Sequence, residues 1–326
     1  MDVEEIVALS VKHNVSDLHL CSDSPPRWRR LGRLEPAPFP PPDVEALLKR
    51  WLNDEQQGAW WANGQVDFAV TLAGNQRLRG SAFNHMLGVS ITLRLLPLTC
   101  PQLSALGVPR AIPELLANDN GLILVTGATG SGKSTTLAAM VDFLNHHTDG
   151  HILTLEDPVE FMYQSERCLI QQREIGQHSP SFAEALRGAL REDPDIILLG
   201  ELRDSETIRL ALTAAETGHL VLATLHTRGA AQAIERLVDT FPAQEKDPVR
   251  NQLAGSLRAV LAQKLRQDVQ GGRVALYELL VNTSAAANLI REGKTWQLPG
   301  IIQTGQQAGM QNFDQSLAER KAQGRL

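Results

Sequence analysis

The sequence is short of three things: cysteine, long apolar runs and positive charge. Its three cysteines, Cys21, Cys100 and Cys168, lie far apart and form no Cys-x-x-Cys pair, so neither a disulfide framework nor a structural zinc site is expected. No apolar stretch approaches the ~18 residues that a membrane-spanning helix needs, and the first ten residues carry acids where a signal peptide carries Lys or Arg. We therefore expect a cytoplasmic protein that reaches a membrane only through a partner.

The balance of charge argues against a protein whose main partner is nucleic acid. The net charge is −6, with 31 Lys and Arg against 37 Asp and Glu. One local exception is the basic and aromatic run Arg27-Trp28-Arg29-Arg30, followed by Arg33, because such clusters can stack on and grip a single strand. The simpler interpretation, which we favour, is a strand edge whose basic side chains are solvated or face a neighbouring subunit.

The length of 326 residues and a hydrophobic content of 43% suffice for two domains. Residues 1–96 combine a helical start with short alternating stretches and predict a small α+β domain. A Pro-rich run at 36–42 is expected to be an internal loop, because a helix capped by Asp43 follows it directly. Four prolines across 97–113 predict the inter-domain linker, which leaves 114–326 as the second domain.

In the second domain, apolar runs alternate with helical patterns. Runs that are apolar on both faces predict a buried, mostly parallel sheet and therefore an α/β fold, which binds ligands at the carboxyl ends of its strands. The expected strands are Leu122–Val125, Ile152–Leu155, Ile196–Leu199 and Leu220–Thr224, with helices near 135–147, 181–192 and 205–217. Beyond Ala243 the pattern predicts a helix to about Leu265, a strand at Val274–Val281 and a helix across Ala285–Gly293.

A complete phosphate-binding loop, G-A-T-G-S-G-K-S, stands at 127–134 between an expected strand and an expected helix. Its glycines let the backbone curl around an anion; Lys133 would reach the β- and γ-phosphates, and the Ser134 hydroxyl would ligate Mg²⁺. The loop therefore predicts binding of ATP and Mg²⁺. The predicted nucleotide contacts are Gly127, Ala128, Thr129, Gly130, Ser131, Gly132, Lys133, Ser134 and Thr135.

Polar residues follow three other expected strands. Glu201 ends an apolar run and would hold Mg²⁺ or its water. The segment I-L-T-L-E-D-P-V-E at 152–160 has three carboxylates, Glu156, Asp157 and Glu160, one of which could polarise the attacking water. His219 and His226 bracket the fourth strand where an end could face the γ-phosphate, and with no cysteine or second close histidine we do not expect them to bind metal.

Taken together, these motifs resemble the type II/IV secretion ATPase superfamily, and within it most closely the twitching-motility ATPases that retract type IV pili. The resemblance is carried by Val125–Leu144, by the acidic segment 152–160, by A-L-R-E-D-P-D-I-I-L-L-G-E-L-R-D at Ala189–Asp204 and by T-A-A-E-T-G-H-L-V-L-A-T-L-H-T at Thr213–Thr227. S-D-L-H-L at Ser16–Leu20 and F-N at Phe83–Asn84 extend it over nearly the whole chain.

The resemblance implies a PAS-like N-terminal domain, a RecA-like ATPase domain with C-terminal helices, and a homo-hexameric ring on the cytoplasmic face of the inner membrane, acting on a pilus or secretion platform protein. It implies that Glu160 is the general base, that Glu201 is the Walker B carboxylate and that His219 and His226 fill the histidine-box positions. Arg79 and Arg94 match arginines that reach a neighbouring subunit's nucleotide, where they would neutralise charge on the γ-phosphate.

Two departures and three alternatives accompany this interpretation. The family's A-I-R-N-L-I-R-E motif reads A-A-A-N-L-I-R-E at Ala285–Glu292, and the chain ends soon after Phe313–Leu317. We expect ATP hydrolysis to survive both departures, and pilus retraction is the activity that they bear on. The alternatives are an assembly or export ATPase of the same superfamily, which usually is longer and carries a four-cysteine metal element, a ring-forming scaffold that binds ATP without turnover, and a RecA-like ATPase acting on nucleic acid.

Overall fold

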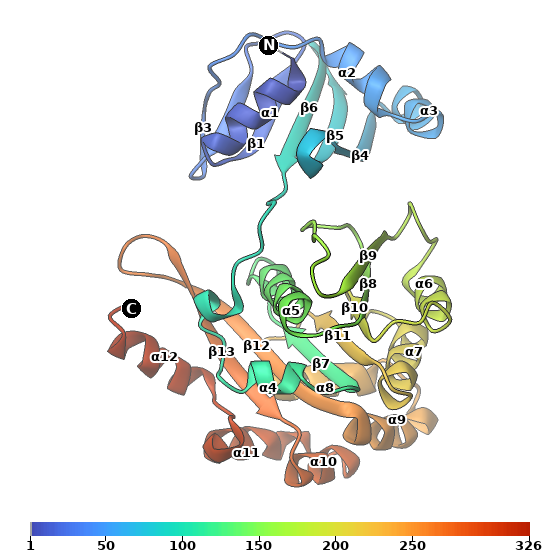
Figure 1. The fold of residues 1–326 in the computed structure, drawn as a ribbon, viewed down its shortest axis with the longest axis vertical. Coiled ribbons are helices and arrows are strands. Elements are labelled where there is room, and N and C mark those ends of the chain that lie inside the picture. Colours follow the sequence, from blue (N-terminus) through green and yellow to red (C-terminus); the bar gives the residue numbers. More distant parts are fainter. Residues whose placement is uncertain (1) are drawn as a thin grey trace. The chain divides into compact units, whose positions relative to one another are not determined.

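The computed structural model describes residues 2–326, which divide into two compact units (Figure 1). One runs from the N-terminus to Thr99 and includes Glu160–Met162; the other comprises Cys100–Val159 and Tyr163–Leu326. Each unit has its own sheet and hydrophobic core. No helix within residues 2–326 is long and apolar enough to cross a membrane.

The first unit is an antiparallel sheet with three α-helices, an α+β arrangement. Its strands lie in the order β3-β2-β1-β6-β5-β4, each antiparallel to its neighbour. Its elements are α1 (Val3–Lys12), β1 (Val15–Cys21), β2 (Arg27–Arg30), β3 (Arg33–Pro36), α2 (Val44–Trp51), α3 (Asp54–Asn63), β4 (Gln65–Thr71), η1 (Ala73–Asn75), β5 (Arg77–His85) and β6 (Gly88–Leu95).

Short-range polar contacts determine where these helices begin. The Asp2 carboxylate accepts a hydrogen bond from the Glu5 amide, and the Glu5 carboxylate accepts one from the Asp2 amide, which forms a capping box at α1. Asp43 accepts from the Ala46 amide and starts α2 where the sequence predicts a helix. Each cap contributes about 1 kcal/mol to helix stability.

The second unit is a seven-stranded sheet covered by helices on both faces. Its first half consists of η2 (Leu103–Leu106), α4 (Ile112–Leu116), β7 (Gly121–Thr126), α5 (Lys133–His147), β8 (His151–Glu156), β9 (Leu169–Glu174), α6 (Phe182–Ala189) and β10 (Ile196–Leu199). Its second half consists of α7 (Ser205–Glu216), β11 (Leu220–Leu225), α8 (Ala230–Asp239), α9 (Ala243–Ser256), β12 (Leu257–Gln267), β13 (Arg273–Val281), α10 (Ser284–Arg291), η3 (Thr295–Gln297), α11 (Leu298–Thr304), η4 (Gln306–Ala308) and α12 (Phe313–Ala322).

The sheet of the second unit has the order β13-β12-β7-β11-β10-β8-β9, and only β13 runs antiparallel. Along β7, Leu122 and Leu124 pack with α6 to α11, whereas Ile123 and Val125 pack with η2, α4 and α5. A strand buried on both faces requires a continuous apolar run, which is the pattern that predicted it. The expected α/β class with a mostly parallel sheet is confirmed.

One predicted element is wrong. The expected helix from Ala243 to about Leu265 ends at Ser256, and the next residue begins the strand β12. The spacing of apolar residues in 257–267 fits a helix and a strand equally well, so the pattern alone does not decide. Pairing decides it: β12 bonds to β7 on one side and to β13 on the other, which satisfies both edges of its backbone.

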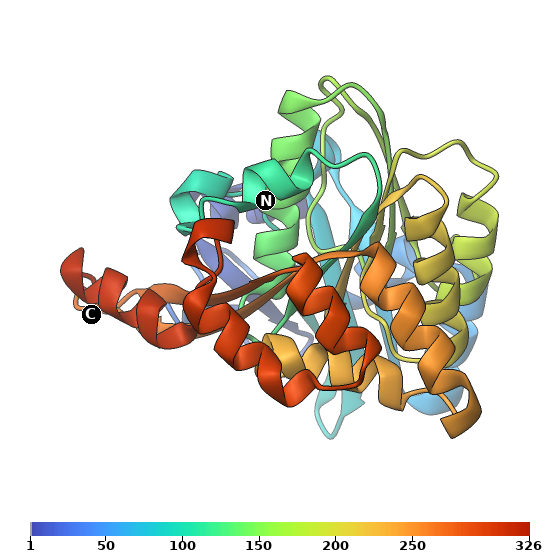
Figure 2. The same ribbon diagram turned by 90° about the horizontal axis from the view of Figure 1, so that it is seen from below.

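Much of the proline-containing segment 97–113 packs into the second unit. Leu103 and Ile112 are 5% and 1% exposed and belong to the core around α5. The carbonyl oxygen of Gly107 accepts a 2.6 Å hydrogen bond from Arg320 of α12, whose side chain also bonds the Ala275 carbonyl of β13. Figure 2 shows the C-terminal helices, in red, alongside the β12–β13 hairpin. Through Arg320, the C-terminal helix α12 thus holds the segment that follows Thr99 against the second unit.

Candidate active site

The loop at 127–134 joins the end of β7 to the start of α5, as the sequence predicts. At Gly127 a Cβ would collide with the Ser131 side chain and lie 2.7 Å from the Gln263 carbonyl oxygen, so only glycine fits. Gly132 has φ of +90°, a left-handed conformation that also favours glycine. Among residues 2–326 no side chain caps α5, so the first amides of this helix face the loop, where an anion binds favourably.

Lys133 lies inside this loop. Only 8% of the residue is exposed, and its Nζ donates to the carbonyl oxygens of Gly127 (2.8 Å) and Ala128 (3.0 Å). Phosphate oxygens would accept hydrogen bonds from the same ammonium group. The outer part of the loop is open to solvent: Ala128, Thr129, Gly130 and Ser134 are exposed, and Thr135 is half-buried.

Two threonines fasten the end of β11 to the root of the loop. The Thr126 hydroxyl accepts from the Thr227 amide (2.9 Å), lies 2.8 Å from the Thr227 hydroxyl and donates to the Thr227 carbonyl (3.0 Å). Thr227 follows His226 directly. Because these bonds are short and mutual, they fix the backbone beside His226 against the strand that carries the loop.

The predicted pair Glu201 and His226 is brought together by adjacent strands. Glu201 follows β10 and His226 follows β11, and their Oε1 and Nε2 atoms lie 2.9 Å apart. Arg203 binds the other carboxylate oxygen of Glu201 at 2.6 Å. The Leu202 amide donates to the Thr224 carbonyl (3.1 Å), which holds the two strand ends in register.

Opposing effects set the pKa of Glu201. Partial burial raises the pKa, whereas the hydrogen bond from Arg203 and the positive charges of His226 and Arg203 lower it, and the lowering prevails. The carboxylate is therefore ionised at neutral pH. Since it already accepts from two side chains, it is suited to hold a metal ion through a water molecule rather than directly.

The carboxylates that follow β8 differ in their surroundings. Glu156 is 9% exposed and accepts from the Thr154 hydroxyl (2.7 Å) and the Gln172 amide (3.2 Å). These bonds tie Glu156 to its own strand and to β9. Asp157 is exposed and Glu160 is half-buried. Glu156 therefore supports the fold of this edge of the sheet.

The backbone that leads to Glu160 is held from β9. The Val159 amide donates to a carboxylate oxygen of Glu174 at 3.0 Å, and Glu174 is only 4% exposed. A buried carboxylate that accepts a backbone hydrogen bond restricts the loop around it. The segment next to Glu160 is thus ordered by a residue distant in the chain.

The expectation that both histidines lie at the loop's edge of the sheet is wrong for His219. His219 precedes β11, its carbonyl oxygen accepts from the Gly121 amide at the start of β7, and its ring bonds the Ala214 carbonyl. The phosphate loop lies at the other end of β7, roughly 20 Å away at the rise of a β-strand. Because β7 and β11 are parallel, residues that bracket one strand lie at opposite edges of the sheet.

Arg79 and Arg94 lie in the first unit on neighbouring strands. They are directly opposite each other in the pairing of β5 with β6. Arg94 donates to Asp17 at 2.9 Å, and 63% of its side chain is exposed. Residues directly opposite each other in an antiparallel pair lie on the same face of the sheet, so Arg79 and Arg94 share one face with Asp17, which pairs with Arg94.

The basic and aromatic run in β2 does not present its aromatic ring. Trp28 is 5% exposed and packs edge-on against Phe39 in the core of the first unit. Stacking on a nucleic-acid base requires an exposed ring face. The buried ring of Trp28 therefore gives no support for binding of single-stranded nucleic acid at β2.

Three side chains at the site were not predicted from the sequence. Arg203 stands two residues after Glu201, and Thr227 stands directly after His226, so both could have been found by examining the neighbours of the motif residues. Gln263 reaches the loop from β12, with its Nε2 donating to the Ser131 carbonyl at 2.6 Å. No signal pointed to Gln263, because its segment was expected to be helical.

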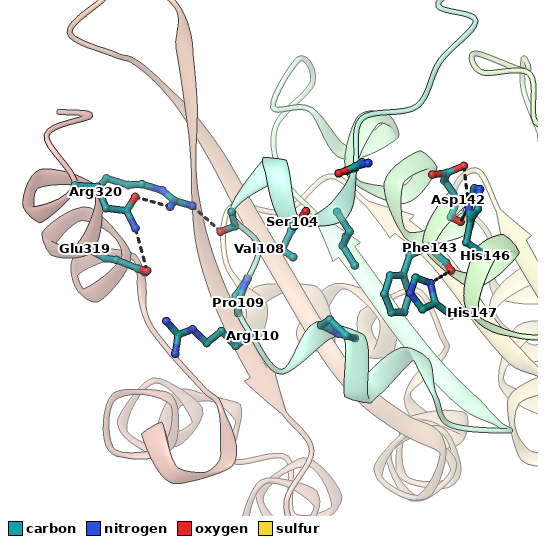
Figure 3. Close-up of a pocket in the computed structure, with 15 residues that line it drawn as sticks. Ser104, Val108, Pro109, Arg110, Asp142, Phe143, His146, His147, Glu319 and Arg320 are labelled. Carbon is teal, nitrogen blue, oxygen red and sulfur yellow. Dashed lines mark hydrogen bonds and ion pairs between the residues drawn. The ribbon is translucent and has the colours of Figure 1, made fainter.

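A groove of about 720 Å³ lies elsewhere on the second unit (Figure 3). It is lined by residues from the segment 102–113, the last turn of α5 and α12, with Arg110 and Glu319 on one side and Phe143 and His147 on the other. The phosphate loop is at the first turn of α5, about 20 Å from its last turn at 1.5 Å per residue. The groove is therefore not part of the site described above.

A phosphate-binding loop between a buried strand and a helix, with a carboxylate and a histidine at the next strand ends, defines a P-loop ATPase of the α/β class. Comparison with protein families then gives the particular family. Residues 62–326 match the family described as "Type II/IV secretion system protein". The chain belongs to this family and is an ATPase.

Relatives resemble the chain over its whole length. It is 74% identical over 326 residues to "Uncharacterized protein YggR" of Escherichia coli (strain K12), covering all of both chains. It is 48% identical to "Type IV pilus retractation ATPase PilT" of Pseudomonas aeruginosa (strain PAO1), over 99% of this chain and 95% of that protein. The crystal structure of the pilus retraction motor PilT with bound ADP superposes with a TM-score of 0.91 at 41% identity, over 100% of this chain and 94% of that one.

Proposed function

We propose that the protein is a motor ATPase of the pilus-retraction kind, a homo-hexameric ring that uses ATP hydrolysis to move its two units and so act on an inner-membrane pilus platform. The observation that carries this proposal is the end-to-end match to the ADP-bound PilT structure, which includes both units rather than the ATPase unit alone. A cytoplasmic position at the membrane, held by the platform protein, follows from the same proposal.

In this proposal the loop residues 127–135 bind ATP, with Lys133 at the β- and γ-phosphates. Glu160 takes the proton from the attacking water. Support comes from the site itself: Glu156 is occupied by structural hydrogen bonds, whereas Glu160 is half-buried at the end of a segment ordered by Glu174. His226 orients Glu201, to which it lies 2.9 Å away. His219, at the opposite edge of the sheet, supports the fold instead.

The residues present fit a Mg²⁺ ion held mainly by nucleotide and water. Ser134 is exposed on the first turn of α5, and Glu201 is suited to contact through water. No group of three or more His, Cys, Asp or Glu within residues 2–326 is arranged to bind a metal ion. When bound, the ion would neutralise charge on the β- and γ-phosphates.

Arg79 and Arg94 act, in this proposal, on the nucleotide of a neighbouring subunit. They lie directly opposite each other on β5 and β6, and Arg94 would have to exchange Asp17 for the γ-phosphate to act there. The ring would bring this face to the next subunit's loop. ATP binding would draw the first unit of one subunit towards its neighbour, and hydrolysis would release it.

The helix α10 departs from the motif of the retraction family, so pilus retraction is the part of the proposal that needs its own test. At the positions of the family's Ile and Arg, this chain has Ala286 and Ala287, which are 0% and 8% exposed. The chain should be expressed in a cell that lacks its retraction ATPase, and twitching should be scored beside Lys133→Ala. Restored twitching that depends on Lys133 is expected. Full ATPase activity without twitching would instead identify a specialised relative that does not retract pili.

A further inference from the structure

Gln263 approaches the phosphate loop from β12, the strand that the sequence pattern did not predict. The residue is 2% exposed, and its Nε2 donates to the Ser131 carbonyl oxygen at 2.6 Å. Its own carbonyl oxygen lies 2.7 Å from the place of a Cβ at Gly127. One residue of β12 therefore meets both the start of the loop and its last turn.

This hydrogen bond fixes the direction of one peptide unit. A trans peptide is planar, and its C=O and N–H point in opposite directions. The carbonyl of Ser131 points at Gln263, so the amide of Gly132, in the same peptide, points to the other side. In loops of this kind, such backbone amides are the groups that cradle the phosphates.

The amide of Gln263 has a defined orientation, and it carries a cost. If the amide were flipped, its Oε1 would face the Ser131 carbonyl, and two acceptors would oppose each other. In the observed orientation Oε1 is buried and has no hydrogen-bond partner in residues 2–326. Burying the Oε1 acceptor without a partner costs free energy, which offsets the gain from the hydrogen bond to the Ser131 carbonyl. Stability alone therefore does not account for glutamine here.

We propose that Gln263 is a positioning residue for ATP binding, which holds the Ser131–Gly132 peptide so that its N–H faces the nucleotide's phosphates. This inference rests on the proposed nucleotide site at 127–135. The amide of Gln263 organises the loop before the nucleotide arrives. Without the Gln263 amide, the Ser131–Gly132 peptide lacks this restraint, and ATP has to order the peptide on binding.

The test uses the full-length protein and a fluorescent ADP analogue, with steady-state ATPase kinetics beside the binding titrations. Gln263→Met should weaken nucleotide binding roughly 3- to 10-fold, as expected for one hydrogen bond. KM for ATP should rise by a similar factor while kcat stays within about twofold. The Gly132 N–H, which Gln263 holds in place, would contact phosphate equally in the ground state and in the transition state. Gln263→Glu should weaken binding further, because it loses the same hydrogen bond and also places a carboxylate against the Ser131 carbonyl oxygen and near the anionic phosphates.

Two controls separate positioning from support of the fold. In Gln311→Met the lost bond is of the same kind, from Nε2 to the Tyr277 carbonyl at 3.0 Å, and KM should not change. The melting temperature of nucleotide-free Gln263→Met should stay close to that of the wild type, because removal of the unpaired Oε1 offsets the loss of the donor to the Ser131 carbonyl. A lower melting temperature with KM unchanged would overturn the proposal.

Lys133→Ala distinguishes failure of this inference from failure of the nucleotide site. If Lys133→Ala loses binding and Gln263→Met binds as tightly as the wild type, only the role of Gln263 is overturned. If Lys133→Ala also binds like the wild type, the proposed site falls, and the inference falls with it.

Discussion

Glu201 is a residue whose neighbours, rather than its type, set its chemistry. Burial opposes its ionisation, yet Arg203 and His226 hold its pKa below the usual range. Because the folded-state pKa is depressed, these contacts stabilise the protein above the ordinary pKa of glutamate. That contribution is lost as the pH falls through the folded-state value.

Arg203→Gln should raise the pKa of Glu201, since it removes a hydrogen bond and a charge while burial remains. The acidic limb of the pH profile of kcat/KM should then move to higher pH, with activity near pH 8 little changed. Arg236→Gln, an exposed arginine on α8, serves as the control. An acidic limb that stays in place in Arg203→Gln would show that Glu201 does not govern it.

Glu160→Gln should lower kcat roughly 10²- to 10⁴-fold, the usual contribution of a general base, while nucleotide affinity changes little. Phosphate release and fluorescent ADP binding measure the two quantities separately. The exposed Glu166, six residues further along the same connection, provides a matched control as Glu166→Gln. Wild-type turnover in Glu160→Gln would remove this residue from the role of base and direct attention to Asp157.

Among the elements, α12 matters because of one buried cation. Arg320 is 5% exposed and donates to backbone carbonyls of both the segment after Thr99 and β13. A guanidinium satisfied by carbonyl oxygens alone ties three parts of the chain together without a carboxylate partner. The point where the chain enters the second unit is thereby held at Gly107.

Arg320→Met should destabilise the second unit by about 3 kcal/mol, because three hydrogen bonds from a charged donor, to Gly107, Ala275 and Gln323, are lost while the length of the side chain is kept. Urea denaturation followed by far-UV circular dichroism, which detects the helices of the second unit, would measure the loss. The adjacent, exposed Lys321→Met should cost less than about 0.5 kcal/mol. Equal stability of the two variants would show that the hydrogen bonds of Arg320 contribute nothing to the free energy of unfolding.

The elements also show how far a sequence pattern reaches. The four central parallel strands were predicted, because burial on both faces demands continuous apolar runs. The strand β12 was missed, since its apolar spacing is compatible with a helix and only its pairing with β7 and β13 distinguishes the two. The prolines of 97–113 predicted a linker, but Leu103 and Ile112 are buried in the second unit.

At the scale of the whole molecule, the proposed ring predicts that inactive subunits rescue one another. Lys133→Ala subunits lack a working loop, and Arg79→Ala subunits lack an arginine for their neighbour. When the two are mixed and reassembled, about a quarter of the interfaces should join an intact loop to an intact Arg79 and recover activity. ATPase assays on each variant and on the mixture would measure this.

Light scattering should show a hexamer in each of these preparations. A mixture no more active than its components, although reassembled, would place Arg79 in the same subunit as the nucleotide it serves or outside the reaction. A mixture of Lys133→Ala with Glu160→Gln provides the control, because both substitutions affect the same site and should not complement each other.

The sequence by itself determined the phosphate loop and the family, because a loop that binds phosphate through its own backbone needs contiguous residues of fixed type. It also indicated Glu201, Glu160 and His226 as polar residues at strand ends. The tertiary structure alone decided their partners: it paired Glu201 with His226 and Arg203, placed His219 at the far edge, and brought Gln263 to Ser131. The physical reason is that neighbours in a parallel sheet follow from the order and direction of strands in space, which the order of strands along the chain does not specify.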